Sequence, residues 1–310
     1  THTYVAFQSL DPLVLGAIKR KNIATEKLVR LIEGLRQYTH STQTDLLVGL
    51  PNEDFDSHVR SLETALRYGI DLIQGGEIRM LPGSELNSDQ DRQTYEIKTK
   101  YRLCEGQYGY YRGRLVAEFE EVVRQTSTMS EMEMLNLRVL RTIFYASVTI
   151  GEHRPLISFL VKNGHSIVEI FKRVSEKNPD YPAFDAALDW CMEQAQGEWF
   201  DNLDDANGFF ALEKNADELF DGKPFLKLNY GMFARLLHHP DEYEDFNRKM
   251  EDSVQAIVPA ETHMVVRDII RLCKARNLIR RNLMDGRTGS ETIELSDQAW
   301  SALERSGYAT

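Results

Sequence analysis

Polar residues and glycines follow three short apolar segments of the chain, and these residues are the best placed to bind a small molecule. Residues 8–9 follow the first segment, residues 49–53 the second and residues 74–77 the third. If the segments are parallel strands, their carboxyl ends meet at one edge of the sheet, where α/β proteins bind ligands. Gly49 would let a ligand approach the backbone closely. The alternative, which the pattern alone favours, is that Gly49 and Pro51 only make a strand-to-helix turn.

Glu53 and Glu77 are the acidic residues near this edge that could act as a general base. Proton transfer of that kind needs a second group within hydrogen-bond reach, and the neighbouring sequence offers none. An unrelated α/β enzyme that uses either glutamate is therefore the weakest of the hypotheses.

The cysteines exclude several kinds of site. Cys104, Cys191 and Cys273 lie far apart in the sequence. Three cysteines are too few for a disulfide scaffold, and their odd number suits a reducing compartment. Because there is no C-x2-C pair, a cysteine-based zinc site is not expected. We predict a cytoplasmic protein that supplies no metal ligands from this chain.

The composition describes an acidic chain of 310 residues, with 37 Lys and Arg against 48 Asp and Glu and a net charge of −11. Such a surface repels phosphate backbones and anionic membranes, so neither is an expected partner. No apolar run reaches the roughly 18–20 residues of a membrane helix.

Strand-like and helix-like segments alternate along the first ninety residues. Strands are expected at 3–9, 45–49 and 70–74, with helices between them. A β-α-β-α-β order implies right-handed crossovers and a parallel sheet or part of a barrel. Because the chain opens in a strand, we expect a fragment whose sheet edge is covered by missing chain or by a partner.

The rest of the chain is expected to be mainly structural. Glycines and tyrosines at 106–113 suggest a packed loop or a cover for the site. Helices are expected over 130–144, 155–163, 166–177 and 184–198. A helix followed by a hairpin over 278–295 is reminiscent of a winged helix. The local basic residues are Arg276, Arg280, Arg281 and Arg287. Nucleic-acid binding by this acidic chain is a minor alternative.

Several strings in the first hundred residues resemble radical SAM enzymes, in particular those that carry an N-terminal cobalamin-binding domain. The strings are FQSLDP at 7–12, DLLVGLPNED at 45–54, MLPGSEL at 80–86 and YEIKTKYR at 95–102. The second is similar to the "GLPGET"-type turn of that family, and the last two to its "MLLPGTEL…YGMKTKFR" run. The resemblance is fairly specific over residues 3–112 and looser to about residue 175.

The resemblance implies which residues would contact S-adenosylmethionine. Gln8 and Ser9 match the strand beside its amino-acid and ribose groups. Arg20 matches a basic position that often contacts its carboxylate, which an arginine fork suits; a solvated residue in a basic run is the alternative. The contacts matched to the second turn and the third strand are Leu47, Gly49, Glu53, Ile73, Gln74 and Gly75, with Leu47, Gly49 and residues 73–75 near adenine. Asn52 stands where relatives usually have glycine.

One departure from the family decides what this chain can do alone. Radical SAM enzymes hold a [4Fe-4S] cluster on a C-x3-C-x2-C loop after the first strand of the barrel, and this sequence has no such triplet. The cluster ligands and any cobalamin domain would therefore lie outside this chain.

The expected organisation is α/β and has three parts. Residues 1–112 would be the C-terminal half of a radical SAM barrel, residues 113–200 a helical region, and residues 201–310 a small mixed domain. The missing N-terminal half of the barrel would be its partner.

The resemblance implies reductive cleavage of S-adenosylmethionine for radical chemistry on a small-molecule or natural-product substrate, with methyl transfer as one outcome where cobalamin is used. This chain alone is expected to be inactive. The alternative is a non-catalytic scaffold or partner-binding protein that retains a half-barrel.

Overall fold

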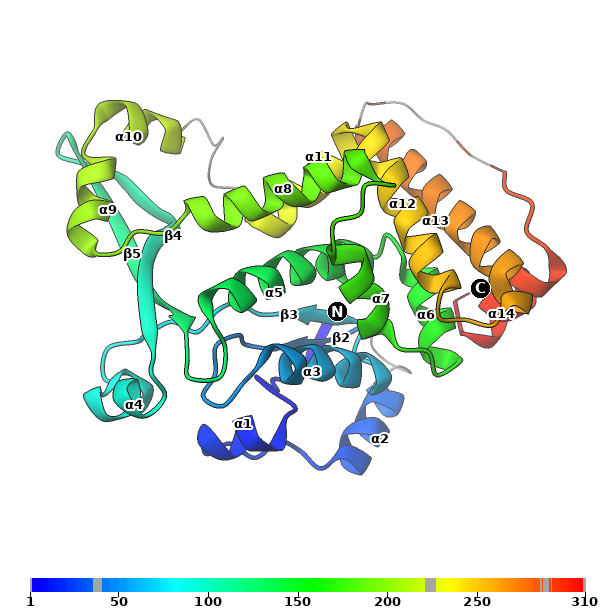
Figure 1. Ribbon diagram of the computed structural model, residues 1–310, viewed down its shortest axis with the longest axis horizontal. Coiled ribbons are helices and arrows are strands. Elements are labelled where there is room, and N and C mark those ends of the chain that lie inside the picture. Colours follow the sequence, from blue (N-terminus) through cyan, green and yellow to red (C-terminus); the bar gives the residue numbers. More distant parts are fainter. Residues whose placement is uncertain are drawn as a thin grey trace.

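Three short parallel strands form a sheet near the middle of the molecule (Figure 1). The computed structural model describes residues 2–35, 41–220, 227–284, 286, 290 and 292–308. Strands β1 (His2–Tyr4), β2 (Ser41–Asp45) and β3 (Leu72–Gln74) lie in the order β1-β2-β3. Isolated bridges between Gln8 and Leu46 and between Val48 and Glu77 continue the pairing beyond the strands.

Helices connect the strands, as the sequence predicts. Helices α1 (Pro12–Ala17) and α2 (Thr25–Leu35) come between β1 and β2, and α3 (Phe55–Arg67) comes between β2 and β3. The Asp11 carboxylate accepts from the amides of Leu13 and Val14 at the start of α1. The mixed α/β class with a parallel sheet is therefore confirmed. The second strand was expected at 45–49 but begins at Ser41, because pairing with β1 continues through a polar segment.

Helices bury one face of the sheet more than the other. Along β2 and its continuation, Thr42, Thr44, Leu46 and Val48 are at most 3% exposed, and Leu46 belongs to a core shared with α2, α3 and the later helix α5. The alternating residues Gln43, Asp45 and Leu47 are only half-buried. Side chains of a strand point to opposite faces in turn, so the helices cover one face and leave the other, more polar face partly open.

A long antiparallel hairpin follows the sheet and extends from the body of the molecule (Figure 1). After a short turn, η1 (Glu85–Asn87), and helix α4 (Asp89–Thr94), strands β4 (Lys98–Tyr111) and β5 (Arg114–Gln125) pair along their lengths. Arg112 and Gly113 join them with φ of 50° and 74°, the two positive values of a type I′ turn. The expectation of a loop at 106–113 was wrong, because the segment is the end of β4 and the turn of the hairpin. The expected packing is present, since the rings of Tyr108 and Tyr110 lie 5.6 and 5.1 Å from that of Phe220.

The expected central helices are present. Helix α5 (Glu131–Phe144) begins at a capping box of Ser130 and Glu133 and continues into one π-helical turn, η2 (Tyr145–Thr149). Helices α6 (Arg154–Lys162), α7 (Ile167–Ser175) and α8 (Pro182–Gly197) follow.

The described C-terminal residues are helical. The elements are α9 (Leu203–Phe210), α10 (Glu213–Phe220), α11 (Leu228–His238), α12 (Pro240–Gln255), η3 (Ala260–Thr262), α13 (His263–Met284) and α14 (Asp297–Arg305). The predicted hairpin over 278–295 was wrong, because α13 continues through its first strand to Met284. No strand occurs in the described part of 201–310, so the expected mixed domain is all helical there. Arg280 and Arg281 belong to helix α13, and Arg287 lies outside the described residues.

The three predicted parts share one core. A single cluster of buried apolar residues runs from Phe7 through Leu140 to Leu303. The expected boundary at 112/113 falls in the turn of the hairpin, and Phe200, at the next boundary, exchanges two backbone hydrogen bonds of 2.8 Å with Tyr101.

Candidate functional site

A cavity of about 880 Å³ opens beside the carboxyl ends of β2 and β3. Residues 73–77 form one wall, and the hairpin contributes Arg102 and Glu120. Helix α5 contributes Arg138 and Arg141, while α8 and α11 close the opposite side. The volume and the position suit a small-molecule site of an α/β fold.

Of the residues that the resemblance implied, Ile73, Gln74 and Gly75 line this cavity. Gly75 has φ of 120°, and a Cβ there would lie 2.1 Å from the carbonyl oxygen of Leu46. Only glycine fits so close to a neighbouring strand. This reason could not be predicted from the sequence, because the contact is made with the segment that follows β2 and not with a ligand.

Gln8 and Ser9 lie on the β1 side of the sheet and do not line the cavity. Gln8 has φ of 66° and exchanges backbone hydrogen bonds with β2, donating to Asp45 and accepting from Leu47. Ser9 is 1% exposed, and its hydroxyl accepts from the amide of Asp11. Both residues therefore hold the exit of the first strand.

Arg20 also lies away from the cavity. Its Nη2 donates to the carbonyl of Ala6 at 2.6 Å, and its Nε is enclosed without a hydrogen-bond partner among the described residues. Leu47 is half-buried on the open face of the sheet. The structure therefore does not bring Arg20 and Leu47 together with residues 73–75.

Gly49 and Glu53 form a buried turn beneath the hairpin and α5. The Glu53 side chain, 1% exposed, accepts from the Gly49 amide at 2.9 Å and lies 3.0 Å from Nδ1 of His58. A Cβ on Gly49 would come within 3.2 Å of side-chain atoms of Val123 and Met134. Asn52 has φ of 63°, so it adopts the left-handed geometry expected where relatives have glycine. This geometry fits the turn hypothesis for Gly49.

A charged cluster at one end of the cavity was not expected from the sequence. Glu77 lies 3.3 Å from Arg102, 3.6 Å from Arg138 and 4.0 Å from Arg124. Burial would raise the pKa of Glu77, but Arg138, Arg102 and Arg124 together hold it well below its ordinary range. Glu77 is therefore held in its ionised form, which makes it a weak base.

Arg124 forms the enclosed side of this charged cluster. It is 1% exposed, and its guanidinium lies 4.1 Å from the centre of the Trp199 ring. Its three guanidinium nitrogens have no hydrogen-bond partner among the described residues, and burial lowers its pKa. Cation–π contact and the nearby Glu77 compensate part of that burial.

Helix α5 carries the arginines that face the cavity. Arg138 and Arg141 are spaced by three residues, so they share one side of the helix. This spacing is visible in the sequence, as are residues 74–77, which follow the third predicted strand. The other members of the charged cluster come from distant segments and meet only through the fold. Next to these arginines, Tyr145 and Tyr230 pack edge to face at 5.7 Å.

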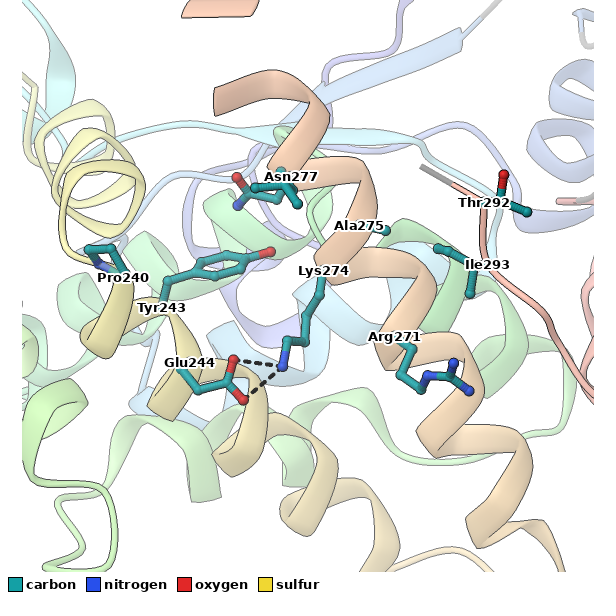
Figure 2. Close-up of a pocket in the computed structure, with 10 residues that line it drawn as sticks. Pro240, Tyr243, Glu244, Arg271, Lys274, Ala275, Asn277, Thr292 and Ile293 are labelled. Carbon is teal, nitrogen blue, oxygen red and sulfur yellow. Dashed lines mark hydrogen bonds and ion pairs between the residues drawn. The ribbon is translucent and has the colours of Figure 1, made fainter. Parts of the chain in front are cut away.

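A second cavity, of about 450 Å³, lies between α12 and α13 (Figure 2). Tyr243, Lys274 and Arg271 line it, and Figure 2 shows Lys274 paired with Glu244. Arg271 lies 3.2 Å from Asp268. Because both cations already have carboxylate partners, this cavity offers less to a charged ligand than the first.

The described residues do not fit an iron–sulfur cluster. Cys104 is half-buried, Cys191 and Cys273 are buried, and all three are free thiols in separate elements. Within the described ranges no three His, Cys, Asp or Glu side chains gather to hold a metal ion. The described helices are also too short or too polar to cross a membrane. No protein-family model matches the chain, and no curated protein is significantly similar to it.

Proposed function

We propose that this chain forms the C-terminal half of a radical SAM barrel and lines its small-molecule site. The observation that carries the proposal is the sheet with its two unlike faces. Three consecutive parallel strands have helices on one face, while Gln43, Asp45 and Leu47 are left partly open on the other. In a (β/α) barrel the helices lie outside and the second face looks inward.

The resemblance and the cavity support the same location for the ligand. Residues 73–75, matched to the strand beside adenine, line the cavity of about 880 Å³. S-adenosylmethionine would supply a 5′-deoxyadenosyl radical when it is bound and reduced. The chain's own residues would position the ligand and exclude water from the cavity. Gln8, Ser9 and Arg20 would reach the cofactor only from the β1 side of the sheet.

The cluster would have to be held by another polypeptide segment, because the cysteines of this chain do not fit it. Cobalamin would likewise bind outside this chain, with methyl transfer as one outcome. The cavity volume suits a metabolite or natural product rather than a macromolecule, and the net charge of −11 disfavours nucleic acid.

The test starts from the reading frame upstream of Thr1. We expect a C-x3-C-x2-C motif there, or on a chain encoded beside it. The polypeptide that contains both halves is then reconstituted anaerobically with iron and sulfide and mixed with S-adenosylmethionine and a reductant. We expect 5′-deoxyadenosine, and none from a matched variant with the three cluster cysteines changed to alanine.

Absence of the motif from both places, or no 5′-deoxyadenosine from a reconstituted protein, would contradict the proposal. Either result would favour the scaffold alternative, in which the half-barrel binds a partner without chemistry.

A further inference from the structure

The cations of the larger cavity differ in whether they have an anionic partner. Among the described residues five cationic side chains line it, and four of them are ion-paired: Arg79 with Glu120, Arg102 with Glu77 and Glu198, Arg138 with the same two glutamates, and Lys227 with Glu105. The fifth is Arg141. No described carboxylate lies within ion-pairing distance of Arg141.

The hydrogen bonds of Arg141 fix its position at the strand ends. Its Nη2 donates to the carbonyl of Gly75 at 2.7 Å and to that of Leu46 at 3.3 Å. Its Nε and Nη1 have no acceptor in the described part of the protein, and neither is among the enclosed polar atoms. A guanidinium carries five N–H donors, so Arg141 has donors left for a ligand.

The electrostatic setting of Arg141 favours an incoming anion. Burial lowers the pKa of Arg141. The negative charges of Glu77, Glu53 and Asp45 raise it, although none of these carboxylates is within ion-pairing distance. An arginine stays protonated in spite of such a shift. Glu77 is shared by three other arginines, and Asp45 accepts from the Tyr4 hydroxyl. These acids already have partners, so the positive charge of Arg141 is left under-compensated.

The cavity wall next to Arg141 offers a surface for a ring or another apolar body. Tyr145, Trp190 and Tyr230 line the cavity from η2, α8 and α11. Gly231 packs close to Trp190, since a Cβ there would lie 3.0 Å from the indole. Aromatic side chains of this kind hold ring systems by stacking or edge contacts.

We propose that Arg141 binds the anionic group, a carboxylate or a phosphate, of a ligand whose ring or apolar body lies against Tyr145, Trp190 and Tyr230. The inference rests on the proposed function in that it names the substrate class of the same cavity. Binding can nevertheless be measured on this chain without cluster or S-adenosylmethionine, so the two proposals can fail separately.

The test uses two fluorescent probes with the same ring skeleton. 8-Anilinonaphthalene-1-sulfonate carries an anion, and N-phenyl-1-naphthylamine does not. We expect Arg141→Met to weaken binding of the anionic probe by about tenfold or more, the loss of a charge-assisted hydrogen bond. Binding of the neutral probe should change by less than about twofold. Arg79→Met is the matched control, because Arg79 lines the same cavity but is paired with Glu120, and it should affect neither probe.

Competition on the wild-type chain distinguishes the two anions. Phenyl phosphate or benzoate should displace the sulfonate probe, and phenol should not. Displacement by one anion and not by the other shows which of the two anionic groups the cavity selects, and displacement by both supports the proposal without selectivity between them. This arm needs no variant, so it also serves if Arg141→Met fails to fold by circular dichroism.

Three results would overturn the proposal. The first is equal binding of the sulfonate probe to wild type and Arg141→Met. The second is an equal loss of both probes, which would mean that Arg141 only keeps the cavity open. The third is no displacement by either anion.

Discussion

Gly75 shows how one residue sets the geometry of the strand ends. A Cβ at this position would clash with the Leu46 carbonyl at 2.1 Å, whereas one on the adjacent Gly76 would meet nothing within 4 Å. We expect Gly75→Ala to lower the free energy of unfolding by at least about 2 kcal/mol, through strain at a positive φ and displacement of β2. Gly76→Ala should cost less than about 1 kcal/mol. Urea unfolding of the two variants measures both values, and equal costs would contradict the explanation.

His153 makes stability depend on pH. It is fully buried, with Nδ1 3.1 Å from the Ser147 hydroxyl and Nε2 3.2 Å from Oδ1 of Asn247. Burial lowers the pKa of His153 to about 4, and the bond to Asn247 offsets this in part. His153 therefore binds a proton near pH 6.5 in the unfolded chain but stays neutral in the folded protein. Its contribution to the free energy of unfolding is complete above pH 6.5 and is lost as the pH falls towards 4.

We expect His153 to account for about 2 kcal/mol of lost stability between pH 7.5 and pH 5. His153→Gln should show a smaller loss over the same interval, whatever its stability at pH 7.5. Chemical unfolding of both proteins at the two pH values provides the comparison. Parallel losses would show that another group causes the pH dependence.

At the residue scale the sequence identified some local roles and missed those made by the fold. The Asp11 cap and the Ser130–Glu133 capping box can be recognised from sequence alone, because their partners lie within three residues. The pairing of Glu77 with Arg102 was not visible, because the two residues meet only after the hairpin folds back.

At the element scale, Glu77 is the point where three elements are tied together. It follows β3 and faces Arg102 of β4, Arg124 of β5 and Arg138 of α5. The Glu77 side chain is only 9% exposed, so removing its charge leaves buried cations without a partner. We expect Glu77→Gln to lower the free energy of unfolding by about 3 kcal/mol. Glu118→Gln, at an exposed position on β5, should cost less than about 0.5 kcal/mol.

Thermal and urea unfolding of the two glutamate variants would test this role. The salt dependence is a second readout, because screening weakens exposed pairs far more than buried ones. A cost for Glu77→Gln no larger than that of the control would show that the arginines find other partners.

The elements that the sequence predicted well are those with periodic apolar faces and clear caps. Helices α3, α5 and α7 begin at side-chain caps, whereas α6 and α8 have a proline in the first turn instead. The hairpin was missed because its exposed residues do not alternate in polarity: Tyr110, Tyr111 and Val116 are all more than half exposed. The wrong prediction of strands over 278–295 has a different cause. Basic and β-branched residues there suggested strands, but no stop signal precedes Met284, and α13 continues.

At the scale of the whole molecule, the open edge of the sheet is the feature that relates the fold to the proposed function. The amides of Val5 and Gln8 donate to Gln43 and Asp45 of β2. Because alternate amides of a strand point to opposite edges, those of Tyr4 and Ala6, on either side of Val5, point away from β2. The alternation is broken only at Gln8, whose positive φ of 66° turns its amide towards β2. The sheet of the described residues has no strand beyond β1.

Hydrogen exchange tests whether this edge is completed by the other half of the barrel. In this chain alone, we expect the Tyr4 and Ala6 amides to exchange much faster than those of Val5 and Gln8. In the polypeptide that includes the cluster-binding half, Tyr4 and Ala6 should become protected by about tenfold or more, since a paired strand amide opens rarely. Equal exchange of Tyr4 and Ala6 in both proteins would mean that the edge is not a joint between two half-barrels.

The large core that the three parts share also has a consequence for how the protein is made. Leu46 and Ile73 belong to one buried cluster with Ile143, Val148 and Phe171, which leave the ribosome much later. At a synthesis rate of about 5–20 residues per second, the apolar face of the sheet stays exposed for several seconds before the helices that bury it are made. During that time the nascent chain exposes both an apolar sheet face and an unpaired strand edge, a combination that promotes aggregation. Slower growth at low temperature and a chaperone that shields the emerging sheet are therefore the conditions under which this polypeptide should be obtained in its native form.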